Sequence, residues 1–182
     1  MTSHNENDYG EGVNNISGTN YDWGVYNSIS NGGNQAGLWR TLTRSEWVFL
    51  LTTRYTSSGI RYAKAQVNGV NGLILVPDDW NVTTYSLNNA NSGSSSYTSN
   101  VVGEMVWQNT FEQAGAVFLP AAGYRARTSL YGVGSYGDYW SSSSYYGSSF
   151  AYHVEFYYDY LSPERSDYRY YGRSVRLVCP AE

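Results

Sequence analysis

The spacing of apolar side chains predicts a helix in residues 38–54. The side chains that repeat at the i, i+3, i+4 interval of one helix face are Trp47, Leu50 and Leu51. Thr43 is followed three residues later by Glu46, which is the signature of a capping box that satisfies backbone N–H groups at a helix start. Together these patterns make residues 38–54 the clearest helix of the chain.

A second helix is expected in residues 104–115, after the polar, low-complexity stretch 81–100, which predicts a surface loop. One face of this helix would carry Val106, Trp107, Thr110, Phe111 and Ala114. Gly115 should end it, because glycine readily adopts the left-handed conformation common at helix ends. The apolar run 116–120 then predicts a buried strand.

Other segments have the shorter patterns of strands. Residues 61–80 predict two strands around a Gly/Asn turn. The C-terminal part predicts strands at 150–158 and 173–179, joined by an irregular excursion that contains Pro163. Residues 1–36 are rich in turn formers and are expected to be irregular. Helices followed by a β-rich second half indicate a single α+β domain.

Alternation assigns faces within the two last strands. In strand 150–158, the expected inward side chains are Tyr152, Val154 and Phe156. The opposite face would carry His153, Glu155 and Tyr157. In the last strand, Val175, Leu177 and Cys179 would share one face, so we expect a buried, inert thiol rather than a nucleophile paired with a histidine.

Composition narrows the function classes. The chain has 182 residues, a net charge of −4 and a pI near 5.1, which argues against a nucleic-acid partner because phosphate binding needs surplus Lys and Arg. No apolar run approaches the ~18 residues of a membrane-spanning helix. We divide the chain into a flexible or truncated lead-in, 1–20, and one domain, 21–182.

Catalytic constellations are scarce. The two histidines, His4 and His153, and the single cysteine do not make a zinc motif, so no metal, cofactor or enzyme activity is expected. The acidic pair Asp78 and Asp79 in PDDWN could bind calcium or act as a general base. A turn after the preceding strand is the favoured interpretation, with an Asp bonded to its own backbone.

Tyrosine is the unusual feature, since thirteen of the 20 tyrosines lie between residues 124 and 171. Tyrosine offers a large amphipathic contact area for little rotamer entropy, and antibody paratopes use it with Ser, Gly and Asn for this reason. The alternative is that the tyrosines build a polar-edged core. That alternative fails for the adjacent pairs 157–158 and 170–171, because neighbouring strand positions face opposite ways.

Five phrases, in this order, resemble the C-type lectin-like domains of gut bacteria and their phages. They are GLWRTLTRSEWVFLL (37–51), VNGLILVPDDW (70–80), AVFLPAAGYR (116–125), YWSSS (139–143) and SVRLV (174–178). The formylglycine-generating and sulfatase-modifying enzymes are more distant relatives of these domains. Many members with this pattern are variable proteins of diversity-generating retroelements. There a reverse transcriptase miscopies adenines of a template repeat, and the altered copy replaces the 3′ end of the gene.

The resemblance implies a C-type lectin-like fold, with two helices, antiparallel sheets and many loops, and a variable region at about 124–171. The implied framework positions are Trp140, Ala151, Val154, Phe156, Pro163, Gly172, Val175 and Val178. The implied varied, ligand-binding positions are Tyr131, Tyr136, Asp138, Tyr145, Tyr146, Ser148, Ser149, Phe150, His153, Tyr157, Tyr158, Asp159, Tyr160, Ser166, Asp167, Tyr168, Tyr170 and Tyr171.

The amino-acid alphabet agrees with this origin. Adenine mutation of AAC codons yields NNC codons, which never encode Lys, Glu, Gln, Met or Trp. Residues 141–171 contain no Lys, Gln, Met or Trp, and Glu155 and Glu164 are the exceptions that would come from other codons.

The resemblance implies a binding module for a macromolecular ligand, a protein or glycan on a cell surface, carried by a phage virion or a bacterial surface. A non-varying surface domain of the same fold is the alternative. A sulfatase-modifying enzyme ranks third, because that activity relies on paired cysteines and this chain has only Cys179. The calcium motifs of sugar-binding lectins are missing as well. The fold usually pairs its first and last strands, yet no first strand is evident in residues 1–36.

Overall fold

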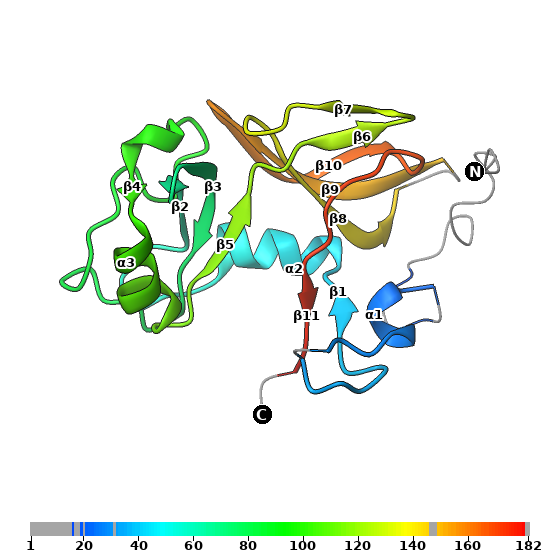
Figure 1. The fold of residues 1–182 in the computed structure, drawn as a ribbon, viewed down its shortest axis with the longest axis horizontal. Coiled ribbons are helices and arrows are strands. Elements are labelled where there is room, and N and C mark those ends of the chain that lie inside the picture. The colour runs from blue at the N-terminus through cyan, green and yellow to red at the C-terminus, as the bar shows by residue number, and fades with distance from the viewer. Residues whose placement is uncertain (1–15, 17–18, 20, 31, 146–148, 181–182) are drawn as a thin grey trace.

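The structure is a computed structural model that describes residues 16, 19, 21–30, 32–145 and 149–180 (Figure 1). It combines short helices with several mainly antiparallel sheets, so the predicted α+β class is confirmed. Among these residues, no helix has both the length and the apolar character needed to cross a bilayer. Of the expected lead-in, only Ile16 and Thr19 are described, and His4 lies outside the described residues.

A four-stranded sheet occupies one side of the molecule (Figure 1). In the order β4-β2-β3-β5, its strands are Val101–Val102, Tyr62–Val67, Val70–Leu75 and Val117–Pro120. β2 and β3 form the predicted hairpin. Its turn residues, Asn68 and Gly69, have φ values of 48° and 80°, the left-handed conformation that two-residue hairpin turns require.

Both faces of this sheet are buried. One face, with Ala63, Ala65 and Ile74, packs against a cluster that includes the stacked rings of Trp80 and Phe111. Side chains on the other face contribute to a second cluster, which helix α2 (Arg44–Val48) and the three-stranded sheet described below also help to build. The alternation of side chains along β2 and β3 therefore serves two cores rather than one core and solvent.

A three-stranded antiparallel sheet, ordered β10-β9-β8, forms the other main layer. Its strands are β8 (Gly137–Ser144), β9 (Phe150–Tyr157) and β10 (Tyr160–Tyr168). The expected irregular excursion is thus wrong, because most of it is strand β10. Pro163 fits within the strand because the β9–β10 register shifts between Ser162 and Arg165, and such an irregularity tolerates a residue without an N–H donor.

The predicted capping box is present at the start of α2 (Arg44–Val48). Thr43 Oγ1 accepts from the N–H of Glu46, and the Glu46 carboxylate accepts from the N–H of Thr43. The helix continues as a π-helical segment, η2 (Phe49–Thr53), and α2 packs against the three-stranded sheet. Its Trp47 ring lies 6.4 Å from that of Tyr139, so α2 closes the shared core.

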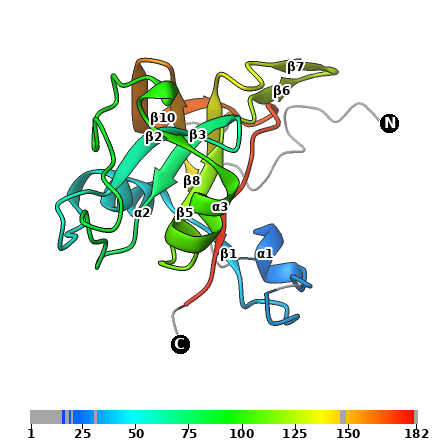
Figure 2. The ribbon, with the colours of Figure 1, turned by 60° about the vertical axis from the view of Figure 1, so that its left-hand side comes forward.

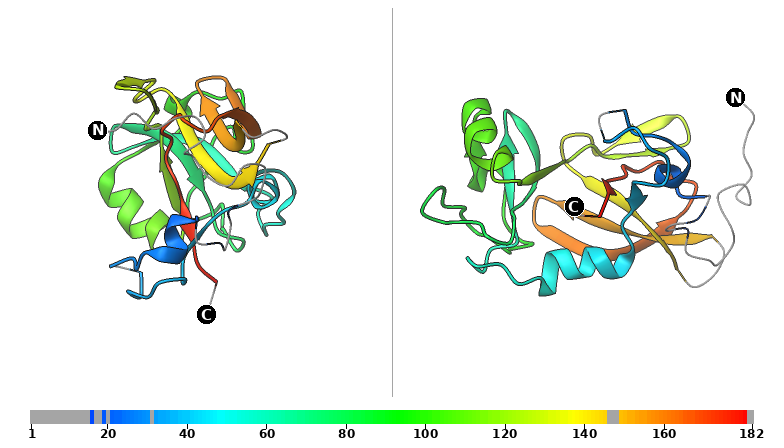
Figure 3. Two further views of the ribbon diagram at one scale, coloured as in Figure 1. Left: turned by 90° about the vertical axis from the view of Figure 1, so that its right-hand side faces the viewer. Right: turned by 90° about the horizontal axis from the view of Figure 1, so that it is seen from below.

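The two ends of the domain pair with each other. β1 (Arg40–Thr41) lies antiparallel to β11 (Leu177–Val178), beside each other in Figure 3. The prediction that the helix begins at residue 38 is wrong, because β1 occupies residues 40–41 and the helix begins at Arg44. The strand predicted at 173–179 contracts to two residues, and Val175 and Cys179 are exposed rather than buried. The last segment instead follows β8, with Ser174 bridged in parallel to Tyr139.

The second predicted helix is present as α3 (Glu104–Val106) and a π-helical segment, η4 (Trp107–Glu112). Phe111 is buried and Gly115 adopts a φ of 85°, but Val106 and Ala114 are exposed, so the predicted apolar face was too wide. The loop before it is not wholly a surface loop, because Leu87 and the short helix η3 (Tyr97–Ser99) contribute buried side chains.

Two smaller elements complete the fold. α1 (Trp23–Tyr26) is a short helix in the stretch expected to be irregular. β6 (Tyr124–Ala126) and β7 (Ser129–Tyr131) form a hairpin, which Figure 2 shows projecting at one edge of the molecule. Gly172 bridges Arg125, so this hairpin is tied to the segment that follows β10.

Candidate ligand-binding surface

Aromatic rings form a continuous series of contacts over the tyrosine-rich part of the chain. We call this series the aromatic belt, and its members are Tyr124, Tyr131, Tyr145, Phe150, Tyr152, Tyr168, Tyr170 and Tyr171. Neighbouring ring centroids are 4.4 Å apart at the closest, between Phe150 and Tyr168, and 6.3 Å at the widest, between Tyr168 and Tyr171. Offset and edge-to-face contacts at these spacings favour a fixed arrangement of rings.

A second, smaller group lies at the β9–β10 hairpin. Tyr157 contacts Tyr136 at 4.9 Å and Tyr160 at 5.0 Å, and we call these three residues the hairpin triad. Tyr157 and Tyr160 are direct cross-strand partners, which explains their stacking. Between them, Tyr158 is 65% exposed at the turn and Asp159 is exposed.

A buried lysine binds the backbone of this hairpin through hydrogen bonds. Lys64 of β2 is the only lysine in the chain and is fully buried. Its Nζ donates to the carbonyls of Gly93 at 2.6 Å and Tyr157 at 2.5 Å, and more weakly to that of Tyr158 at 3.3 Å. Burial lowers the pKa of Lys64 to about 8, although Asp159 acts in the opposite direction. The ammonium thus ties the backbone of the hairpin turn to the four-stranded sheet.

The outer face of the three-stranded sheet is polar in its middle. Residues directly opposite each other on neighbouring strands point to the same face of a sheet. Trp140, His153 and Arg165 are such partners and form one row across the three strands. The row beside it contains Asp138 and Glu155. The side chains of these rows face away from the core that holds Val154 and Phe156.

Arg173 covers these rows and connects them to the aromatic belt. Its guanidinium carbon lies 4.7 Å from the centroid of Trp140, 5.3 Å from that of Tyr171 and 5.4 Å from that of Tyr124, and these contacts are cation–π interactions. Its Nε donates to Asp138 Oδ1 at 3.2 Å, and its NH2 group donates to Asp167 Oδ2 at 2.7 Å. The cation is nearly inaccessible, so it organises the surface from within.

The electrostatics of the covered rows follow from burial. Burial, together with the positive charges of Arg173 and Arg165, lowers the pKa of His153 to about 3, so the imidazole is neutral at neutral pH. Burial raises the pKa of Asp138 while Arg173 opposes the rise. Glu155 is half-buried, and burial raises its pKa as well.

The predicted varied positions fall into distinct environments. The exposed ones are Tyr131, Tyr145, Tyr158, Asp159 and Tyr168. Those of intermediate exposure are Tyr136, Ser149, Phe150, Tyr157, Tyr160, Ser166, Asp167, Tyr170 and Tyr171. Asp138 and His153 are buried, with Asp138 against Arg173 and His153 against Trp140. Tyr146 and Ser148 lie outside the described residues.

Sequence reasoning missed three residues that complete this surface. Tyr124 lies in one of the phrases that carry the family resemblance, and its ring stacks on Tyr131. Tyr152, expected on the inward face, is half-buried; its ring lies 4.8 Å from the guanidinium of Arg44 in α2, and it belongs to the aromatic belt. Arg173 had no distinguishing signal, because only the fold brings its side chain over β8.

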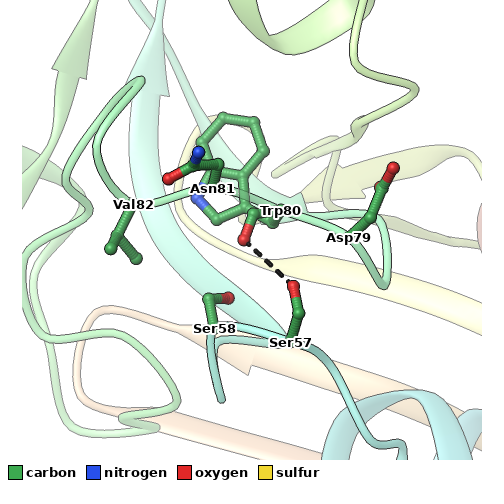
Figure 4. A pocket seen from close by; sticks show the side chains of 6 residues that line it. All are labelled: Ser57, Ser58, Asp79, Trp80, Asn81 and Val82. Atoms are coloured by element: carbon green, nitrogen blue, oxygen red, sulfur yellow. Dashed lines mark hydrogen bonds between the residues drawn. The ribbon is translucent and has the colours of Figure 1, made fainter.

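The acidic pair of PDDWN lies elsewhere, and the two residues differ. Asp78 pairs with Arg54 at 3.0 Å, and a turn bond runs from the N–H of Trp80 to the carbonyl of Pro77 at 3.2 Å. Asp79 lines a shallow pocket with Ser57, Ser58, Trp80, Asn81 and Val82 (Figure 4). The favoured turn is therefore present, although the Asp78 carboxylate bonds Arg54.

Comparison with known proteins assigns the part of the chain that carries the candidate surface to one family. A family model described as a domain of unknown function (DUF8237) matches residues 76–178, which is more than half of the chain. The chain belongs to the DUF8237 family. The DUF8237 region contains the aromatic belt, the hairpin triad and the covered polar rows, while Lys64 and the capping box precede it. No curated protein and no solved structure matches the chain.

Proposed function

We propose that this protein is a ligand-binding module with a C-type lectin-like scaffold, the variable protein of a diversity-generating retroelement, and not an enzyme. The observation that carries the proposal is the aromatic belt, in which eight aromatic side chains from β6–β10 and the segment after β10 are in sequential contact. A surface of pre-arranged tyrosines supplies flat apolar area and hydroxyl groups together, as paratopes do.

Two further features support the proposal. β1 pairs with β11, in keeping with the expectation that this fold joins its first and last strands. The core-facing side of the three-stranded sheet, with Tyr139, Val154 and Phe156, is separate from the outer face, so outer residues can change without repacking that core. The ligand is a protein or a glycan on a cell surface, met outside the cell by a phage virion or a bacterial surface.

DNA sequence tests the retroelement origin. We expect a repeat near the gene that is almost identical to the 3′ part of the coding sequence and differs from it at adenines, together with a reverse transcriptase gene. Differences spread over all four bases, or no repeat at all, would favour the alternative of a non-varying domain.

Binding assays test the surface itself. The protein is immobilised to capture ligands from gut bacterial surface fractions, and Tyr131, Tyr168 and Tyr171 are then replaced by Ser one at a time. A few central tyrosines should cost ~2 kcal/mol or more of binding each, with near-neutral neighbours. The matched control replaces Tyr26 and Tyr55, which are exposed far from the belt in sequence, and it should bind normally.

Salt gives a second readout. Asp159, Arg165, Asp167 and Arg169 mix both charge signs, so affinity should change little with ionic strength. Normal binding by all the belt variants, with loss on replacing Asp78 and Asp79, would reject the aromatic surface as the binding site.

A further inference from the structure

Three side chains that could bind a metal converge on the outer face of the three-stranded sheet. Asp138 comes from β8, while His153 and Glu155 come from β9, and one ligand-type atom from each lies within 4.8 Å of the other two. The strand register explains this arrangement. Asp138 stands directly across from Glu155, and His153 stands across from Trp140, two residues further along β8.

Three polar atoms of this cluster are buried without a hydrogen-bond partner among the described residues. Within the described part of the chain, neither ring nitrogen of His153 nor Oδ2 of Asp138 has a hydrogen-bond partner. Nε2 of His153 lies 3.6 Å from Oδ1 of Asp138, beyond hydrogen-bonding distance, and the two side chains are only 2% and 1% exposed. Buried polar atoms are normally satisfied, and three unsatisfied atoms in one place point to a missing partner.

We propose that Asp138, His153 and Glu155 bind one divalent first-row transition metal ion, of the type of Zn²⁺. Imidazole nitrogen together with carboxylate oxygen suits zinc and its neighbours, whereas calcium and magnesium prefer ligand sets of oxygen alone. This proposal departs from the sequence-based expectation of no metal, and it does not depend on the proposed binding function.

The charged groups around the cluster carry a net negative charge. Asp138, Glu155 and Asp167 carry three negative charges, and Arg165 and Arg173 carry two positive ones, which leaves one negative charge for the ion to offset. Arg173 engages Oδ1 of Asp138, so Oδ2 remains for the metal.

Binding requires a modest contraction. Zinc–ligand distances of about 2.0–2.2 Å place two ligands of a tetrahedral site roughly 3.3–3.6 Å apart. The cluster therefore has to close by roughly 1.2–1.5 Å from its widest separation of 4.8 Å. Glu155 is the ligand that can move, because its side chain is 19% exposed and its partner Arg165 is largely solvated. Water would complete the coordination.

The composition of the chain makes a clean test possible. His4 and His153 are the only histidines and Cys179 is the only cysteine. The full-length double variant His4→Gln, Cys179→Ser therefore keeps the cluster and removes the other strong zinc ligands. This protein, dialysed against chelator, is titrated with zinc chloride by calorimetry, and its thermal melt is recorded with and without zinc. Cobalt chloride gives an absorption spectrum that reports nitrogen and oxygen ligands.

We expect one ion per chain and a higher melting temperature with zinc. In the same background, His153→Gln and Glu155→Gln should each weaken binding by about tenfold or more, a loss that even outer-shell substitutions can cause. Glu164→Gln is the matched control, because Glu164 on β10 pairs with Arg44 outside the cluster. If His153→Gln fails to fold, Glu155→Gln at the partly exposed position carries the test. The proposal is overturned by no saturable binding up to millimolar zinc, or by binding that survives in both ligand variants.

Discussion

The two main sheets differ in what they pack against. The four-stranded sheet buries both faces, with aliphatic side chains in two clusters. The three-stranded sheet packs one face into an apolar core, through Tyr139, Val154 and Phe156, while its outer face carries aromatic and charged residues that Arg173 covers in part. A sheet buried on both sides leaves little freedom for substitution, because every side chain has fixed neighbours. The exposed and half-buried residues on the outer side of the three-stranded sheet have fewer fixed neighbours, so they can change while the fold is kept.

Phe156→Ala should give the largest loss of stability, because it leaves a cavity in the core on the buried face of the three-stranded sheet. Phe156 is fully buried and its ring stacks on Tyr139 at 6.2 Å. We expect the free energy of unfolding to fall by about 3–5 kcal/mol in chemical denaturation. Trp140, expected from the family resemblance to be a framework residue, is only half-buried, so Trp140→Ala should cost less. A loss at Phe156 below that at Trp140 would contradict the division into two faces.

Lys64→Met tests the connection between the two sheets. The change leaves the carbonyls of Gly93 and Tyr157 without their donor, and an unsatisfied buried group costs about 1–3 kcal/mol. We also expect faster amide hydrogen exchange at the β9–β10 turn, while β2 and β3 keep their protection. Gln66→Met on the same strand is the control, since Gln66 bonds Asn71 instead. Unchanged exchange at the turn would show that Lys64 does not hold the hairpin.

Replacing four tyrosines of the outer surface together should have a smaller effect per residue. In the variant with Ser at Tyr157, Tyr158, Tyr170 and Tyr171, we expect a cooperative thermal transition and a loss of about 0.5 kcal/mol per residue. The matched control is Tyr139→Ser, in the same sheet but on its buried face, where the hydroxyl donates to the Pro120 carbonyl at 2.8 Å. If the quadruple variant unfolds more readily than the Tyr139 variant, the outer tyrosines are core residues.

Glu46→Gln should have the smallest effect, at the start of the helix that both sheets share. Hydrogen bonds from Arg40 and from Thr43 lower the pKa of Glu46 to about 2. A carboxylate with a lowered pKa stabilises the fold above its unfolded pKa of 4.5, and this contribution is lost as the pH falls toward 2. The pair is about one-third exposed, so solvent screening limits the loss at pH 7 to about 1 kcal/mol or less.

Denaturation at several pH values tests this prediction. The difference between the Glu46→Gln variant and the unmodified protein should shrink between about pH 5 and pH 2. The exposed Glu112→Gln serves as a control for the loss of one negative charge. A difference that stays constant over this range would mean that the ionised carboxylate contributes nothing.

Local features were readable from the sequence because their partners lie within a few residues. The capping box of Thr43 and Glu46 satisfies its own backbone, and the Asn68–Gly69 turn needs only two left-handed residues. The concentration of tyrosines also identified the region that forms the aromatic belt. None of these features depends on which distant segment lies beside it.

Register and burial were decided only by the tertiary structure. Pro163 and the charged residues beside it concealed strand β10, because the pairing of β10 with β9 and a shift in that pairing permit them. The convergence of Asp138, His153 and Glu155 needed the register of β8 and β9. Arg173 buries an outer face that alternation alone would leave exposed. Alternation tells which residues share a face of a strand, but the free energy of burial depends on what then covers that face.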